Sequence, residues 1–393
     1  MIKIINMREN DWLSAHEARE RLGVRAQTLY AYVSRGQVRA EPDPAEPRRS
    51  RYRTSDVVAL TTRKARGRKA SQVAADAIAW GEPVLGSAIT TVANGRLYYR
   101  GRDAVPLART ETFESVARLL RGGGGVPVRR ALRAPPPAGP TMRARLFTTL
   151  ATRAATDEAA LGRRPSDLDD DAASLLDAVA YAVCGEVGGG PIHARLGRAW
   201  GCGPRGLDLI RRVLVLLADH ELNPSTFAAR VAASTGASLS AAALAGLATL
   251  TGPRHGGVAA QVRLLADEAE RQGPREAVAA RLIHWSPPTP GFGHPLYPAG
   301  DPRARALLDA FEAPPPLKAL SEAVEAATGA RDNIDFALVA LTQDLALPAD
   351  APFILFAMAR CAGWLAHAQE QLAGGALIRP RARYQGMAPD TET

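Results

Sequence analysis

The chain has 393 residues, of which 46% are hydrophobic, 23% charged and 5% aromatic, as in a globular protein with a large core or two domains. With only three cysteines, neither a disulfide framework nor a cysteine-based zinc site is predicted. The first residues lack the apolar run of a secretory leader, and the Ala-rich stretch at 239–250 is too short to cross a bilayer. We therefore expect a cytoplasmic protein without a membrane partner.

The net charge of +9 is unevenly distributed. Residues 1–70 hold 16 Lys and Arg against 8 Asp and Glu, so nearly all of the surplus lies there. A basic appendage on a neutral body is typical of a segment that binds nucleic acid. A solubilising tail would have the same charge, so charge alone leaves both interpretations open.

The N-terminal segment has the pattern of two short helices joined by a tight turn. Ser14 and Glu17 have the spacing of a capping box, and the first helix is predicted to end at Gly23. A second helix follows in RAQTLYAYVSRG. A Pro-rich basic hairpin comes next, and Thr54 or Ser55 is expected to cap a third short helix.

The run WLSAHEARERLGVRAQTLYAYVSRGQVR resembles the winged helix-turn-helix of the MerR and excisionase type. This resemblance implies a DNA-binding domain over residues 1–62, with duplex DNA as a partner. A module used only for protein contacts is the alternative. The side chains expected to face DNA are Arg25, Gln27, Thr28 and Arg35.

A basic linker is predicted over residues 63–83, beginning with RKARGRK. Beyond it, SAITTVANGRLYYRGRD alternates apolar and polar residues around Asn94-Gly95, which predicts a small β-hairpin. From about residue 112 nearly to the end, apolar residues recur at helical spacing between Gly- and Pro-rich breaks. The body is therefore predicted to be all-α apart from this hairpin.

Three of the seven histidines lie in Gly-, Pro- or polar-rich segments, where a ring can face a cleft: His220, His255 and His294. Taken singly, each would more often be a core or capping residue. His16 and His367 are expected to be structural or solvated. The spacing of the three histidines excludes a local metal motif, so no metal is predicted. No GxSxG elbow is present.

Five segments occur in the order and spacing seen in citrate synthases: ADHELNPSTFAARVAASTG, GPRHGG, GFGHPLYPAGDPRA, NIDFALVAL and ARCAGWLAHAQEQL with LIRPRARY. The hairpin segment followed by TFESVARLL resembles the entry segment of that family. The resemblance covers roughly residues 84–386. It implies a two-domain helical fold with an active site in the cleft between the domains. The large domain would comprise residues 84–255 and 341–393, and the small domain residues 256–340.

By this resemblance, Asp335 is the base that takes a proton from the thioester methyl of acetyl-CoA. His255 would donate to the thioester oxygen, and His294 would protonate the keto oxygen of the second substrate. Asp335 lies beside Ile334 and Phe336, so we expect burial to raise its pKa. A helix N-cap is its alternative role.

The second substrate, oxaloacetate, is a dicarboxylate, and planar guanidinium groups bind carboxylates in bidentate fashion. With 45 Arg against 4 Lys, a single Arg is weak evidence. Arg360 is the most informative, because it lies among apolar residues where an unpaired charge would be costly. The positions that the resemblance assigns to oxaloacetate are His220, His294, Arg303, Arg360 and Arg379, the last reaching in from the other subunit of a homodimer.

The resemblance thus implies an acyltransferase of the tricarboxylic acid cycle. It would condense acetyl-CoA or propionyl-CoA with oxaloacetate, giving citrate or 2-methylcitrate and CoA, with no further cofactor. HGGVA and GFGHPL stand where many bacterial members have HGGAN and GFGHRV, and this leaves the acyl group open. The alternative function is a DNA-binding transcriptional regulator whose body senses oxaloacetate, citrate or acyl-CoA.

Overall fold

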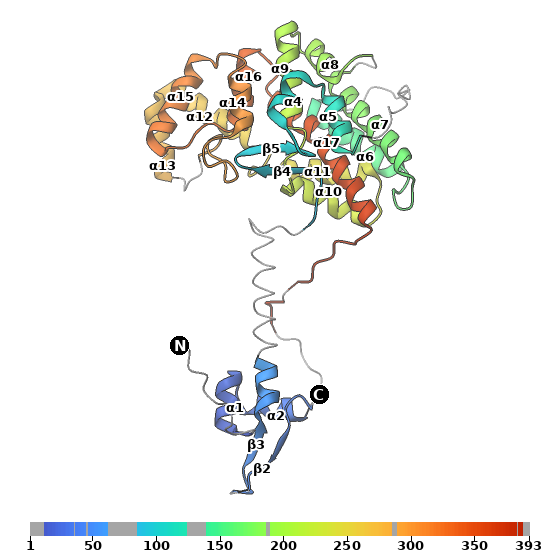
Figure 1. Ribbon diagram of the computed structural model, residues 1–393. Coiled ribbons are helices and arrows are strands. Elements are labelled where there is room, and N and C mark those ends of the chain that lie inside the picture. Colours follow the sequence, from blue (N-terminus) through green and yellow to red (C-terminus); the bar gives the residue numbers. More distant parts are fainter. Residues whose placement is uncertain are drawn as a thin grey trace, which may run out of the picture. The chain divides into compact units, whose positions relative to one another are not determined.

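The computed structural model describes residues 12–61 apart from 35 and 45, 85–123, 139–185, 189–284, and 289–387 apart from 383. The chain divides into two compact units, Met1–Gly86 and Ser87–Thr393 (Figure 1). Each unit has a hydrophobic core of its own.

The first unit combines short helices with a three-stranded sheet. The strands pair antiparallel in the order β1-β3-β2. Leu13 of β1, Leu29 of α2 and Tyr52 of β3 are buried together in the hydrophobic core of this unit. The elements in chain order are β1 (Trp12–Ser14), α1 (Ala15–Leu22), α2 (Ala26–Ser34), β2 (Ala40–Pro42) and β3 (Ser50–Arg53), and residues 54–61 are helical.

Both ends of α1 follow from the sequence. The Glu17 amide donates to Ser14 Oγ at 3.3 Å, and the Ser14 amide donates to Glu17 Oε2 at 2.8 Å. The predicted capping box is therefore confirmed. Gly23 ends the helix with a φ of 61°, a left-handed conformation that favours glycine.

The second unit is almost wholly helical. Strands β4 (Thr90–Ala93) and β5 (Arg96–Tyr99) pair antiparallel, and β6 (Arg102–Asp103) extends the sheet. Asn94 and Gly95 join β4 to β5 with φ angles of 51° and 71°, and two positive φ angles match the twist of a two-residue hairpin. The helices are α4 (Ala104–Thr110), α5 (Phe113–Leu120), α6 (Met142–Thr156), α7 (Pro165–Cys184), α8 (Ile192–Ala199), α9 (Pro204–Leu216), α10 (Pro224–Ser234), α11 (Leu239–Leu250), α12 (Val258–Gln272), α13 (Pro274–His284), α14 (Pro302–Leu308), α15 (Pro315–Thr328), α16 (Ile334–Asp344) and α17 (Ala351–Gly374).

Helix α17 lies at the centre of the second unit. All side chains from Ala351 to Ala368 are buried, and the helix packs against α5, α7, α9, α10, α11 and α16. Its length and composition would suffice to cross a membrane, but its apolar window is entirely buried inside the unit, as in the core helix of a globular protein.

Helices α12, α13, α14, α15 and α16 pack on one another and form one group within the second unit (Figure 1). This group meets the remaining helices where α14 packs on α4 and α9 and where α16 packs on α17. The segments that enter the group, between α11 and α12 and before α14 and α16, lie at this junction. These segments carry His255 and His294, and Asp335 follows in the first turn of α16.

Close packing between α11 and α17 makes Gly246 sensitive to substitution. A Cβ atom at Gly246 would lie 2.6 Å from Cδ2 of Trp364, which is 1% exposed. We expect Gly246→Ala to lower the free energy of unfolding by about 1–3 kcal/mol, because the indole has no room to move. Thermal unfolding of the full chain measures this. Gly374→Ala is the control, because a Cβ there meets nothing within 4 Å; equal melting temperatures for the two variants would contradict the packing argument.

Candidate active site

Six candidate side chains from distant parts of the sequence come together at the junction of the two helix groups. The rings of His220 and His294 lie edge to face at 5.2 Å. The charges of Arg303 and Arg360 act on both His220 and Asp335, and that of Arg360 also acts on His255. The six positions are His220 after α9, His255 between α11 and α12, His294 before α14, Arg303 in α14, Asp335 in α16 and Arg360 in α17.

His220 is held in a buried loop. Its Nε2 lies 2.9 Å from the hydroxyl of Tyr297, and the side chain is 7% exposed. The neighbouring Glu221 accepts the Val92 amide at 2.6 Å, which ties this loop to β4. Burial, with the charges of Arg303 and Arg360, lowers the pKa of His220 well below its usual value. The ring is therefore neutral at physiological pH.

His255 is oriented by Ser225 of α10. Its Nε2 lies 2.8 Å from Ser225 Oγ, and Trp364 Nε1 donates to the same oxygen at 3.1 Å. The serine proton has two available acceptors, His255 Nε2 and Asn223 Oδ1. When the proton goes to His255, the ring carries its own proton on Nδ1 and can donate it elsewhere. Burial and the charge of Arg360 lower the pKa of His255 to about 3.

The tautomer of His294 follows from one backbone contact. Its Nδ1 accepts the Leu296 amide at 3.1 Å, so in the neutral ring the proton is on Nε2. Burial and the charge of Arg303 lower the pKa of His294 to about 4. His294 can therefore act as a neutral hydrogen-bond donor at physiological pH.

Asp301 joins Arg303 to the start of α16. Arg303 Nε and Nη2 donate to the two Asp301 oxygens at 3.0 and 2.7 Å, and both side chains are at most 3% exposed. Burial opposes the charge of Arg303, but the Asp301 carboxylate outweighs it and the pKa of Arg303 is raised. Asp301 Oδ2 also accepts the Ile334 amide at 3.2 Å, so one carboxylate positions Arg303 and the residue before Asp335.

Asp335 lies in the first turn of α16. The N-cap is Asn333, whose side chain accepts the Asp335 amide at 3.0 Å, so the capping role considered for Asp335 is wrong. Asp335 Oδ1 is buried and has no hydrogen-bond partner among the described residues. Burial raises the pKa of Asp335 to about 7, against the lowering effect of Arg303 and Arg360.

Arg360 lies in the middle of α17 and is 1% exposed. Its Nε donates to the Leu217 carbonyl at 3.1 Å, whereas its Nη2 has no partner among the described residues. Burial lowers the pKa of Arg360 to about 10, so the side chain stays charged at neutral pH. A buried guanidinium with a free N–H is suited to bind a carboxylate.

The remaining candidate residues lie apart from this cluster. Arg379 is exposed in the segment after α17 and does not belong to the cluster within the described chain. Arg25, Gln27 and Thr28 are exposed at the start of α2, whereas Arg35 lies outside the described residues. Within the described ranges, no three His, Cys, Asp or Glu side chains are placed to hold a metal ion.

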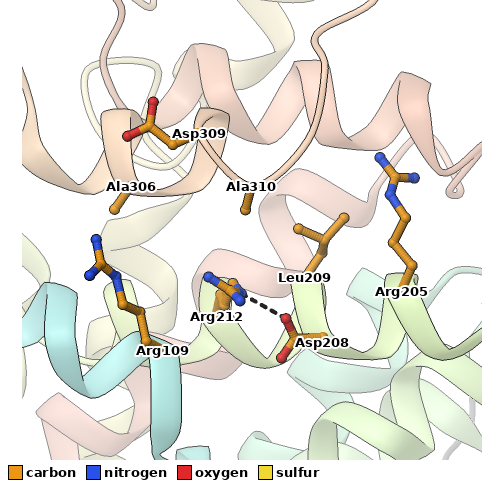
Figure 2. A pocket seen from close by; sticks show the side chains of 8 residues that line it. All are labelled: Arg109, Arg205, Asp208, Leu209, Arg212, Ala306, Asp309 and Ala310. Carbon is orange, nitrogen blue, oxygen red and sulfur yellow. Dashed lines mark hydrogen bonds and ion pairs between the residues drawn. The ribbon is translucent and has the colours of Figure 1, made fainter.

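Two hollows lie beside the cluster. The smaller, about 330 Å³, lies between α4, α9 and α14 and is lined by Arg109, Arg205 and Arg212 among others; Figure 2 shows Arg212 paired with Asp208. The larger, about 740 Å³, includes Tyr297 in its wall. Neither hollow contains the three histidines. His220, Arg303 and Arg360 are buried, whereas His255, His294 and Asp335 are half-buried, and the larger hollow adjoins the cluster through Tyr297.

Sequence reasoning missed the residues that orient the histidines and Arg303, namely Ser225, Tyr297 and Asp301. Ser225 contacts His255 across 30 residues of sequence, and Tyr297 contacts His220 across 77 residues. No local sequence pattern reveals contacts of this range. Asp301 is two residues from Arg303, so this ion pair carried a local signal.

Three comparisons with known proteins bear on this site. The profile described as "Citrate synthase, C-terminal domain" matches residues 128–381. The "Putative citrate synthase 2" of Mycobacterium tuberculosis H37Rv is 37% identical over 198 residues, which are 47% of this chain and 53% of that protein. The chain thus spans about half the length of the curated relatives it matches.

Solved structures extend the similarity. The citrate synthase of Thermotoga maritima MSB8 superposes with a TM-score of 0.64 at 26% identity, covering 80% of this chain and 96% of that one. The Thermoplasma acidophilum enzyme, solved with carboxymethyl coenzyme A and oxaloacetate, has a TM-score of 0.63 at 22% identity, covering 79% and 96%, and shows the likeness of fold.

The raised pKa of Asp335 makes the stability of the protein depend on pH. The group titrates near 3.8 when exposed and near 7 in the folded chain. Above pH 7 the folded state must bury a charge, so we expect Asp335→Asn to have the higher melting temperature there. The difference should shrink as pH falls from 7 and vanish below about 4, where the acid is neutral in both states. Thermal unfolding at several pH values measures it; a pH-independent difference would contradict the assignment.

Proposed function

The chain belongs to the citrate synthase family, and on that premise we propose that it condenses acetyl-CoA or propionyl-CoA with oxaloacetate, giving citrate or 2-methylcitrate and CoA. The observation that supports this function best is the cluster of six side chains at the junction of the two helix groups. It combines a carboxyl whose pKa is near 7, three neutral imidazoles and two charged guanidinium groups. Such a set serves to move protons at a carbon acid and to hold a dicarboxylate.

In the proposed reaction, the Asp335 carboxylate takes a proton from the thioester methyl. His255 donates its Nδ1 proton in a hydrogen bond to the thioester oxygen and so stabilises the enol form. The enol carbon then attacks the keto carbon of oxaloacetate, and His294 gives its Nε2 proton to the keto oxygen. Water hydrolyses the resulting thioester and releases CoA. The Leu296 amide on His294 Nδ1 supports this role, because it leaves the proton on Nε2.

Oxaloacetate would be held by His220, His294, Arg303 and Arg360, and Arg379 would reach in from a second copy of the chain. The free Nη2 of Arg360 supports this placement. A homodimer is then the smallest complete enzyme. We assign residues 84–255 and 341–393 to the large domain and 256–340 to the small domain. We propose that the two domains close on the bound substrates and so exclude water during the condensation.

Acyl-CoA would approach through the larger hollow. It adjoins the cluster at Tyr297, and its walls carry Arg96, Arg109 and Arg305, which suit the phosphate groups of the carrier. This approach brings the thioester past the loop that carries His294.

The test is release of free CoA thiol from acetyl-CoA and from propionyl-CoA, with and without oxaloacetate. We expect release that depends on oxaloacetate and falls at least about a thousandfold in Asp335→Ala, because the variant lacks the group assigned to take the proton. With the intact chain, kcat/KM should rise as pH increases through about 7, since Asp335 must be ionised. Glu270→Ala, which removes an exposed acidic side chain of α12 that lines neither hollow, is the control. Absence of release from a folded protein that binds oxaloacetate would refute the enzyme and favour a sensor.

A second function, DNA binding by the first unit, is favoured by its surface. Arg25, Gln27 and Thr28 are exposed on α2, and the β2–β3 hairpin carries Arg48 and Arg49, which are also exposed. We propose that residues 1–62 form a winged helix-turn-helix of the MerR and excisionase type, with α2 reading the major groove and the hairpin on the backbone. The chain would then be either a DNA-bound synthase or a regulator that senses the synthase ligands.

Binding of the full chain to duplex DNA, followed by fluorescence anisotropy, tests this proposal. We expect affinity to fall steeply with salt, because phosphate contacts release counterions. Arg25→Ala with Arg48→Ala should weaken binding by at least about tenfold. Arg205→Ala with Arg212→Ala, in the second unit, removes the same number of charges, and this control should bind as the native chain does. No binding at low salt would reduce the first unit to a protein-contact module.

A further inference from the structure

The loop that carries His220 is fastened to α17 by three contacts in a row. The contacting positions of α17 are three and four residues apart, so they lie on one face of the helix. The loop supplies three consecutive residues directly before His220. The contacts are Arg360 Nε to the Leu217 carbonyl at 3.1 Å, the Gly363 amide to the Ala218 carbonyl at 3.0 Å, and His367 Nε2 to Asp219 Oδ2 at 3.0 Å.

The third contact is a buried ionic hydrogen bond. Asp219 and His367 are both 0% exposed. Burial raises the pKa of Asp219, but His367 and Arg360 lower it by more, so the carboxylate is ionised at neutral pH. A carboxylate only accepts hydrogen bonds, so the ring of His367 must donate from Nε2. Of the two roles expected from the sequence, structural or solvated, His367 thus has the structural one.

Asp219 acts on two of the residues assigned to oxaloacetate. It directly precedes His220 in the sequence, and its main-chain oxygen accepts a hydrogen bond from the Tyr99 hydroxyl at 3.3 Å. It is also the acidic side chain that most favours the charged form of Arg360. Gly363 permits this closeness, because a Cβ there would lie 2.2 Å from Asp219 Oδ1.

Resting on the proposed function, we propose that Asp219 and His367 are positioning residues for oxaloacetate. His367 holds the Asp219 carboxylate against α17. Asp219 in turn fixes the backbone that presents His220 and supplies the counter-charge of Arg360. Neither residue needs to touch the substrate. His255 and Asp335, which act on the acyl-CoA, are carried by other segments and are not governed by this pair.

The pair also bears on stability, and the substrate that is affected separates the two roles. Removing one partner of a buried ionic pair leaves the other buried and uncompensated, which is strongly destabilising. We therefore expect His367→Leu to lower Tm as well. A purely structural role would not raise the KM of oxaloacetate selectively, so the substrate-specific effect is what identifies positioning.

The experiment compares His367→Leu with His367→Gln in the full chain. The Gln amide can donate from nearly the position of the ring Nε2, whereas Leu cannot donate at all. Calorimetry gives the Kd of oxaloacetate, steady-state kinetics give KM for each substrate, and thermal unfolding gives Tm. We expect His367→Leu to raise the Kd and KM of oxaloacetate by about tenfold or more, with the KM of acetyl-CoA changed by less than about twofold. His367→Gln should restore most of the affinity.

Asp219→Asn is the second variant, used where His367→Leu fails to fold. It keeps a weaker, uncharged acceptor and removes the counter-charge of Arg360, so its oxaloacetate Kd should be higher than that of the native chain. Unchanged oxaloacetate Kd and KM in a folded His367→Leu or Asp219→Asn, with only a lower Tm, would overturn the inference and leave the proposed function intact. A native chain that does not bind oxaloacetate would overturn both.

Discussion

Burial of the Arg360 guanidinium inside the central helix is the constraint on which the rest of the second unit depends. A charge at the middle of α17, 1% exposed, would destabilise the fold unless nearby groups offset it. The offset comes from the loop after α9, whose Leu217 carbonyl and Asp219 carboxylate face Arg360. The loop can approach so closely because Gly363 has no side chain. The same approach brings His220 to the cluster.

The opposite side of the cluster is organised by a second buried anion. Asp301 accepts hydrogen bonds from Arg303 and from the Ile334 amide, so one carboxylate links α14 to the start of α16. Asp335 directly follows Ile334, and its burial raises its pKa to about 7. Two buried carboxylates that stay ionised and one whose pKa is raised therefore stand within a single cluster. Asp219 and Asp301 each have a cationic or hydrogen-bonding partner that keeps them ionised, which suits structural support. Asp335 lacks such a partner at Oδ1 among the described residues, and its raised pKa suits proton transfer.

The two units differ in the exposure of the charged and polar side chains assigned to ligands. The first unit leaves Arg25, Gln27 and Thr28 exposed on a helix, which suits a large anionic surface. The second unit buries Arg303 and Arg360, which suits a small dianion taken out of water. One chain thus presents its charges in two ways, and the proposed synthase and DNA-binding functions draw on separate residues.

The sequence by itself determined the helical class of the second unit and the capping box of α1. Through the family resemblance it also named the six residues that the structure brings together in the cluster. Apolar periodicity and cap residues are local signals, and the motifs around His220, His255 and His294 carried the family resemblance. Tertiary structure alone decided the rest. Ser225, Tyr297 and the Asp219–His367 pair act through contacts between residues 30 to 148 positions apart. The capping residue of α16 proved to be Asn333 rather than Asp335, and His367 proved to be buried. Hydrogen bonds and pKa shifts depend on what surrounds a group in space, and a linear pattern does not contain that information.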